Sequence, residues 1–182
     1  HGVPDPEFCA RVVDAHSGGS VVVGGAIENR VDRVLNWAVY FCDFGRYQNP
    51  VPSGPSPFAS DANISYAMDT LRSVQPIWQE AFSEVVVNQE LSVSGVAITL
   101  RGDIVVRQNR TGLSMRNAML ERFVWGRSYG ATRAGLTNRV ATLTHALVTP
   151  LLPLLLSGRI GRVAWSRGRL RSQFIKALPA IV

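Results

Sequence analysis

The sequence is poor in the residues from which many familiar sites are built. It contains two cysteines, Cys9 and Cys42, three histidines and a single lysine, Lys176. Two cysteines cannot form a disulfide framework or a four-cysteine zinc site, and this sparse use is typical of a reducing compartment. Charged residues make up 18% of the chain and hydrophobic residues 46%. That balance excludes an intrinsically disordered chain, so we expect a folded protein.

Several widespread catalytic and nucleotide-binding motifs are also absent from the sequence. There is no GxxxxGK[ST] phosphate loop, no GxGxxG fingerprint, no HExxH helix and no GxSxG turn. The sequence therefore offers no support for a nucleoside triphosphatase or a hydrolase of these classes. The most apolar run, residues 146–156, is shorter than the ~20 residues that span a bilayer.

Charge is distributed unevenly along the chain. Residues 1–100 contain five basic and eleven acidic residues, whereas residues 101–182 contain fourteen basic and two acidic ones. An excess of arginine in one half indicates a polyanion, a phosphate-bearing ligand or an anionic membrane surface as partner.

Hydrophobic spacing predicts alternating helices and strands. We expect helices over 7–16, 30–44, 67–73, 78–92 and 113–128, and strands over 20–27, 96–100 and 103–107. Residues 45–60 are dense in proline and glycine, which predicts a long irregular loop of the kind that often carries function. In the helix at 113–128, Met115, Met119 and Phe123 share the predicted apolar side, and Ala118 lies opposite.

The C-terminal part combines apolar and basic residues. Arginines follow the apolar run 146–156, and the apolar residues between 160 and 178 fall largely on one helical arc. This pattern predicts an interfacial amphipathic helix with arginines at the level of the lipid headgroups.

An ordered series of short segments carries a resemblance to a known family. In chain order they are a Val-Val-Val-Gly-Gly strand (21–25), Asn-Ile-Ser-Tyr (63–66), a Trp-Gln-Glu-Ala-Phe-Ser-Glu segment (78–84), Leu91 with Gly95, and Glu-Arg-Phe-Val-Trp-Gly-Arg (121–127). This order resembles the C-terminal half of bacterial family 2 glycosyltransferases, over residues 1–135. The resemblance implies an α/β protein with a partial GT-A (Rossmann-like) sheet and flanking helices. Residues 136–182 would then form a membrane-associated helical tail, and we expect the sequence to be a fragment.

The same resemblance implies a reaction. Enzymes of this family transfer a sugar, with inversion, from a nucleotide-diphospho-sugar to a saccharide or lipid-linked hydroxyl, in cell-envelope or polysaccharide synthesis. A divalent cation, Mn²⁺ or Mg²⁺, is expected to be held mainly by residues that precede this sequence. The implied location is the cytoplasmic face of the membrane, and no nucleic acid is expected as a partner. This chain alone is expected to be inactive.

The resemblance also assigns candidate residues by position. Glu84 is the first candidate for the general base that deprotonates the acceptor hydroxyl, and Glu80, four residues earlier on the expected helix, is the second. The expected substrate-binding residues are Asn63, Arg122 and Arg127, and His1 is the candidate metal ligand.

Simpler interpretations stand beside these assignments. Glu80 and Glu84 could be ordinary solvated glutamates, and Asn63 could serve only as a helix cap. Arg122 and Arg127 could belong to a solvated helix face. The alternative function is a basic membrane- or nucleic-acid-binding module without catalysis. Its nucleic-acid form would show binding that weakens steeply with salt.

Overall fold

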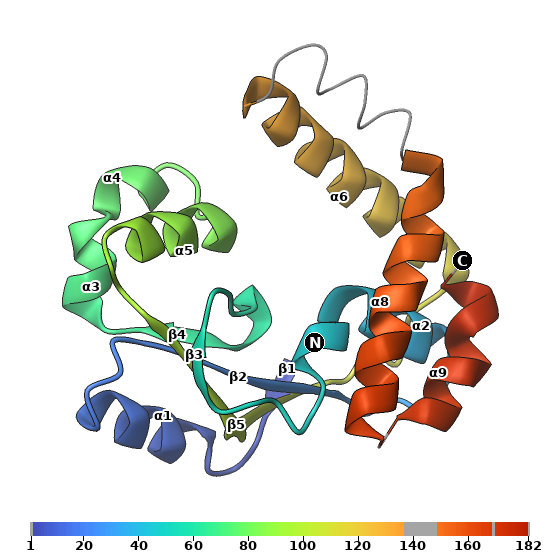
Figure 1. Cartoon of the computed structure of the whole chain (residues 1–182), viewed down its shortest axis with the longest axis horizontal. Helices are drawn as coiled ribbons and strands as arrows, with labels where there is room; N and C mark the ends of the chain where they lie inside the picture. Colours follow the sequence, from blue (N-terminus) through green and yellow to red (C-terminus); the bar gives the residue numbers. More distant parts are fainter. Residues whose placement is uncertain (1, 137–148, 169, 182) are drawn as a thin grey trace. The chain divides into compact units, whose positions relative to one another are not determined.

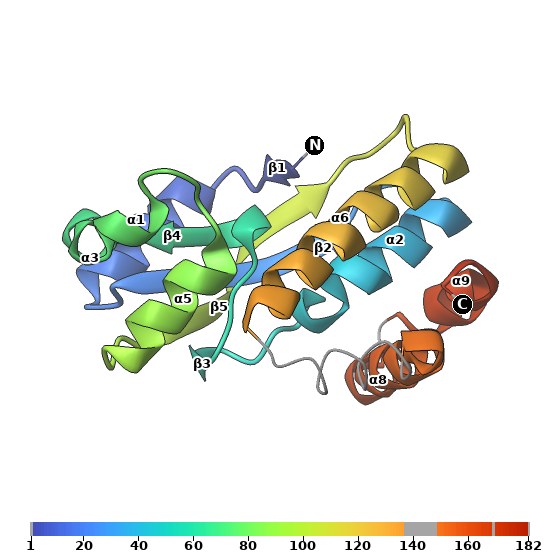
Figure 2. The ribbon, with the colours of Figure 1, turned by 90° about the horizontal axis from the view of Figure 1, so that it is seen from above.

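The computed structural model describes residues 2–136, 149–168 and 170–181, and within them the chain is mixed α/β (Figures 1 and 2). It divides into two compact units. Unit 1 comprises His1–Arg30 and Arg46–Asn109, and unit 2 comprises Val31–Gly45 and Arg110–Val182. The predicted α/β class is confirmed. The predicted boundary between residues 135 and 136 stays a prediction, because it adjoins residues outside the described ranges.

The described strands form one five-stranded sheet in unit 1. They are β1 (Gly2–Pro4), β2 (Val22–Asn29), β3 (Gly54–Ser56), β4 (Ile64–Tyr66) and β5 (Ile98–Gln108). The order is β1-β5-β2-β4, and β3 pairs separately with β5. The central strands β2 and β5 run parallel, and the other pairs are antiparallel. The β-branched run that predicted a buried strand is β2, whose first six residues are all buried.

Helices cover both faces of this sheet (Figure 1). On one face, Val23 and Ile104 pack against Ala15 of α1 (Phe8–Ser17). On the other face, the neighbouring Val22 belongs to a cluster with Val87, Leu91 and other apolar residues under α3 (Met68–Ser73), α4 (Gln75–Trp78) and α5 (Glu84–Val93). Successive side chains of a strand point to opposite faces, so β2 supplies both cores.

The strands are longer and more numerous than the sequence patterns predicted. The two strands expected at 96–100 and 103–107 are one eleven-residue strand, β5, because Arg101 and Gly102 continue the chain between two hydrogen-bonded stretches. β1 and β4, of three residues each, are too short for a periodic pattern to reveal. The proline-rich segment 45–60 was predicted to be irregular, yet it contains the 3₁₀ turn Gly45–Tyr47 and the strand β3, which pairs along β5.

The centre of the sheet carries a break in register. Gly25 pairs with Arg101, but the next residue, Ala26, pairs with Val105, so the chain bulges at residues 102–104. The bulge brings the carbonyl oxygen of Ile104 close to Gly25. A Cβ added at Gly25 would lie 2.0 Å from that oxygen, so no other residue fits without moving the backbone.

Unit 2 is helical in its described parts. Its elements are α2 (Val34–Phe44), α6 (Met115–Leu136), a 3₁₀ turn (Thr149–Leu151), α8 (Leu152–Arg167), α9 (Arg171–Ala177) and a second 3₁₀ turn (Leu178–Ala180). Phe41 of α2 is fully buried and meets Phe174 of α9 edge to face, with ring centroids 5.5 Å apart. Trp165 of α8 meets the same Phe174 ring at 6.3 Å. A cluster of three aromatic rings therefore joins α2, α8 and α9.

The prediction for the buried side of α6 was wrong. Ala118 and Leu113 are buried against Val39 of α2, whereas Met119 and Phe123 are 65% and 66% exposed. Packing with α2 selected the side with small residues, which a hydrophobic count on one helix cannot reveal. No helix in the described ranges combines the length and the apolar character that crossing a membrane requires.

Candidate functional site

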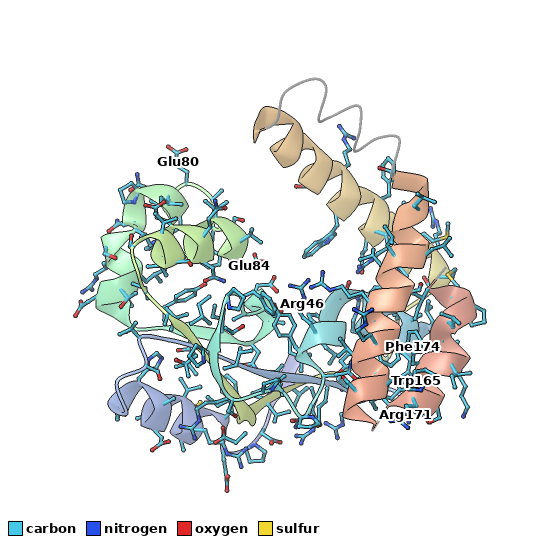
Figure 3. The ribbon with its side chains drawn as sticks, viewed as in Figure 1. Arg46, Glu80, Glu84, Trp165, Arg171 and Phe174 are labelled. Atoms are coloured by element: carbon cyan, nitrogen blue, oxygen red, sulfur yellow. The ribbon has the colours of Figure 1, made fainter. Side chains whose placement is uncertain are left out.

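The two candidate base residues lie in different local structures. The helix expected over 78–92 is interrupted, because α4 ends at Trp78 and α5 begins at Glu84. Trp78 donates from its indole Nε1 to the Leu71 carbonyl oxygen over 2.8 Å, which ties α4 to α3, and its side chain also packs against the apolar cluster that contains Val87 and Leu91 of α5. The two glutamates therefore do not share a helix face. Glu80 points outward from the connection, and Glu84 points toward the segment that carries Arg46 (Figure 3).

Glu84 opens the first turn of α5, where a carboxylate interacts favourably with the helix dipole. It is half-buried and close to two tyrosines. Burial, followed by the charges of Glu84 and Asp61, raises the pKa of Tyr66 to about 12. Burial also raises the pKa of Tyr47; Arg46 opposes this shift, and Glu84 and Asp61 add to it. We call the residues Arg46, Tyr47, Asp61, Tyr66 and Glu84 the Glu84 cluster.

Both tyrosines of the Glu84 cluster are fixed by their neighbours. The Tyr66 hydroxyl donates to Asn88 Oδ1 over 2.8 Å, and its ring meets the ring of Phe82 edge to face. The Tyr47 ring meets that of Phe58 at 6.1 Å. Both hydroxyls are protonated near neutral pH, as tyrosine hydroxyls ordinarily are, and the proton of the Tyr66 hydroxyl is donated to Asn88.

The arginine of the cluster, Arg46, lies close to Tyr47 and to the ring of Phe58. The Arg46 guanidinium carbon is 4.5 Å from the centroid of the Phe58 ring, a cation–π contact. Arg46, Tyr47 and Phe58 all come from the segment 45–60. Sequence reasoning had not singled out these three side chains. The available signal was the length of the loop itself, which had suggested a functional segment without naming its residues.

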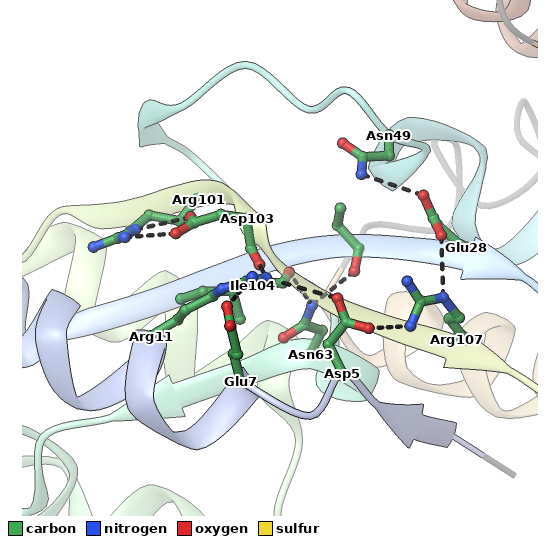
Figure 4. Close-up of polar contacts among 11 residues, drawn as sticks. Asp5, Glu7, Arg11, Glu28, Asn49, Asn63, Arg101, Asp103, Ile104 and Arg107 are labelled. Atoms are coloured by element: carbon green, nitrogen blue, oxygen red, sulfur yellow. Dashed lines mark hydrogen bonds and ion pairs between the residues drawn. The ribbon is translucent and has the colours of Figure 1, made fainter.

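Asn63 is buried and serves the sheet. Its side-chain Nδ2 donates to the carbonyl oxygens of Ala26 and Ile104, over 2.8 and 3.0 Å, on either side of the register break (Figure 4). The turn Asp61–Asn63 is capped instead by Ser60, whose Oγ accepts from the Ala62 amide over 3.3 Å. Both amide hydrogens of Asn63 are used inside the protein, so its expected role in substrate binding stays a prediction.

Ion pairs connect the strands next to this asparagine (Figure 4). Arg107 of β5 pairs with Asp5 and lies 3.4 Å from Glu28 of β2. Arg101 bridges Asp103 and Asp14 of α1, at 2.6 and 2.7 Å. The hydrogen bond from Arg101 lowers the pKa of Asp103. Most charged residues of this region are thus occupied in joining elements of unit 1.

The remaining candidate residues lie elsewhere. Arg122 pairs with Asp43 through both guanidinium nitrogens, one of them at 2.8 Å, within unit 2. Burial would lower the pKa of Arg122, but the hydrogen bond and charge of Asp43 outweigh it and raise the value. Arg127 is exposed on α6. His1 lies outside the described residues, so its proposed metal contact stays a prediction.

Two further sources of evidence, metal-ligand groups among the described residues and similarity to known proteins, leave the site unassigned. Within the described ranges, no three histidine, cysteine, aspartate or glutamate side chains are grouped so that they could hold a metal ion. The divalent cation was expected to be held mainly by residues that precede this sequence, so its binding stays a prediction. No family model, curated protein or solved structure matches the chain.

Proposed function

We propose that this chain forms the acceptor side of an inverting, nucleotide-sugar-dependent glycosyltransferase of the family 2 type, with Glu84 as the general base. The observation that carries the proposal is the placement of Glu84, which is half-buried at the start of α5 and points toward the segment that carries Arg46, whereas Glu80 is exposed and points outward (Figure 3). A carboxylate placed among neutral hydroxyl groups can accept a proton or a hydrogen bond from a sugar hydroxyl.

In the proposed reaction, the Glu84 carboxylate takes the proton of the acceptor hydroxyl as its oxygen attacks the anomeric carbon of the donor. The bond from that carbon to the diphosphate breaks, and the nucleoside diphosphate leaves with the bonding electrons. A hydroxyl is a poor nucleophile near neutral pH, so a positioned base lowers the barrier. The protonated Tyr47 and Tyr66 hydroxyls lie in the same cluster as Glu84, and the acceptor would be a saccharide or a lipid-linked sugar.

The test compares Glu84→Gln with Glu80→Gln in the complete protein that contains this sequence, because the resemblance assigns donor binding to preceding residues. We expect Glu84→Gln to reduce kcat about 10²–10⁴-fold, the usual contribution of a general base, and to leave donor binding unchanged. Glu80→Gln, on the exposed connection, should retain activity. Full activity in Glu84→Gln, or loss of activity only in Glu80→Gln, would overturn the assignment.

The second candidate function is binding without catalysis. The observation that favours it is confined to unit 2, which contains thirteen basic and three acidic residues. This candidate would be favoured if the complete protein binds an anionic partner through this basic unit and transfers no sugar.

A further inference from the structure

The outward face of α8 combines leucines and arginines. Leu154, Leu155 and Leu156 are consecutive and are 62%, 60% and 50% exposed. Leu155, Arg159 and Arg162 follow one another at the spacing of one helix face, and both arginines are exposed. The opposite face carries the buried Ser157 and Ala164. This helix therefore presents apolar side chains to solvent together with positive charge.

α9 extends the same combination. Ile175 is 57% exposed and the next residue, Lys176, is exposed as well. The two helices are held together, because Arg171 donates to the Trp165 carbonyl oxygen over 2.8 Å and Trp165 meets Phe174 edge to face (Figure 3). Trp165 itself remains 48% exposed. We call eight of the exposed residues of these two helices the α8–α9 surface: Leu154, Leu155, Leu156, Arg159, Arg162, Trp165, Ile175 and Lys176.

The positive charge of this surface has no neutralising acid nearby in the sequence. Unit 2 has three acidic residues, and each of them has a hydrogen-bond or ion-pair partner within the unit. Asp32 accepts from Trp37 Nε1 over 2.7 Å, Asp43 pairs with Arg122, and Glu121 binds Arg110 over 2.6 and 2.8 Å. No acidic residue follows Glu121. The field of the α8–α9 surface therefore favours an anionic partner.

We propose that the α8–α9 surface binds the headgroup region of an anionic lipid bilayer, with the helices lying in the plane of the interface. Burying exposed leucines at the acyl boundary of a bilayer lowers the free energy of binding. The phosphate backbone of a nucleic acid offers them no comparable apolar environment. Trp165 has the apolar body and polar Nε1 typical of residues at a membrane interface. Arginines near an anionic surface add an attraction that salt weakens. This binding does not depend on sugar transfer by unit 1.

The test is sedimentation of the full chain with phosphatidylcholine vesicles that contain or lack phosphatidylglycerol, at low and at high salt. Binding should require phosphatidylglycerol and should weaken with salt. Arg159→Ser and Arg162→Ser should each weaken binding about fivefold, because one basic residue near an anionic surface raises the binding constant by about that factor. Leu154→Ser with Leu155→Ser should weaken it about tenfold or more, through lost apolar burial.

Matched controls lie in unit 1. Val93→Ser replaces a valine that is 78% exposed on α5, and Arg72→Ser replaces an arginine whose side chain is 65% exposed. Both should bind vesicles as the parent chain does. The proposal is overturned if the control variants lose binding equally, or if the leucine variants bind normally. It is also overturned if the chain ignores vesicles and binds a DNA duplex that the arginine variants fail to bind.

Discussion

The two units of the molecule use charge in opposite ways. Unit 1 contains six basic and ten acidic residues, and many of them pair across elements, as Arg107 does with Asp5 and Glu28. In unit 2 the three acidic residues are each engaged, which leaves most of its thirteen basic residues without an acid of that unit. Charge thus helps to build unit 1, whereas in unit 2 its excess is available for a partner.

The backbones differ in the same sense. In unit 1 the sheet brings two strands so close that a glycine and a buried asparagine are needed at the register break. In unit 2 the helices are joined by side chains, and several helical glycines have open space around them. Substitutions that affect backbone packing should therefore harm unit 1 far more than unit 2.

The largest effect is expected for Gly25→Ala. The new Cβ would collide with the Ile104 carbonyl oxygen at 2.0 Å and with Asn63 Nδ2 at 2.7 Å, and a backbone atom cannot simply rotate away. We expect a loss of more than about 3 kcal/mol in the free energy of unfolding, as for other overpacked core sites. Urea unfolding followed by far-UV circular dichroism measures this change.

The matched substitution in unit 2 is Gly158→Ala, in the middle of α8. Apart from the adjoining residues and the helix's own backbone, no atom lies within 4 Å of its added Cβ, and alanine is favoured over glycine in a helix by about 1 kcal/mol. This variant should be as stable as the parent chain or slightly more stable. Similar losses in the two variants would contradict the contrast between the units.

The next effect concerns the side chain that supports the register break. Asn63→Ala removes the donors that reach the carbonyl oxygens of Ala26 and Ile104, and both partners are buried near the sheet centre. We expect a destabilisation of about 2–3 kcal/mol, for two lost buried hydrogen bonds. Asn117→Ala, at an exposed position of α6, is the control and should stay within about 0.5 kcal/mol of the parent. An unchanged stability in Asn63→Ala would contradict this structural role and would favour the predicted role of Asn63 in substrate binding.

Much of the fold was accessible from local patterns. The helix predicted at 7–16 is α1, the strand predicted at 20–27 is β2, and the helix predicted at 67–73 is α3, each shifted by two residues or fewer. These elements carry their periodicity within their own residues. The break between α4 and α5 was missed because the apolar spacing over 78–92 continues through it, whereas in the structure α4 ends at Trp78 and α5 begins at Glu84.

The candidate site was accessible only in part. Glu84 was identified through a resemblance in the order of segments, and the structure brings Tyr47, Asp61 and Tyr66 near it. Tyr47 lies in the proline-rich loop and Tyr66 in a strand of three residues, so neither carries a periodic signal. Their proximity depends on the course of the loop relative to the sheet, which is a tertiary feature that local patterns in a single sequence do not predict.

The smallest expected loss of stability concerns the pair between Asp43 and Arg122 in unit 2. Arg122→Met leaves the Asp43 carboxylate, whose side chain is only 19% exposed, without its main partner. Arg122 is 41% exposed, so the pair is intermediate between a surface and a buried one. We expect the free energy of unfolding to fall by about 1–2 kcal/mol at neutral pH. Chemical denaturation at several pH values measures both this loss and its pH dependence.

The sign of that pH dependence follows from Asp43. Burial already raises the pKa of its carboxyl, and the hydrogen bond and charge of Arg122 oppose the shift. Without Arg122 the pKa rises further, so the folded variant binds a proton more tightly than the unfolded chain does. Its stability then increases as the pH falls toward the ordinary aspartate value, and the deficit against the parent narrows. Asp43→Asn combined with Arg122→Met is compared with Asp43→Asn alone, and because neither variant has a carboxylate at this position, the difference between them should not change with pH. A deficit in Arg122→Met that widens on acidification would show that the buried carboxylate is not its cause.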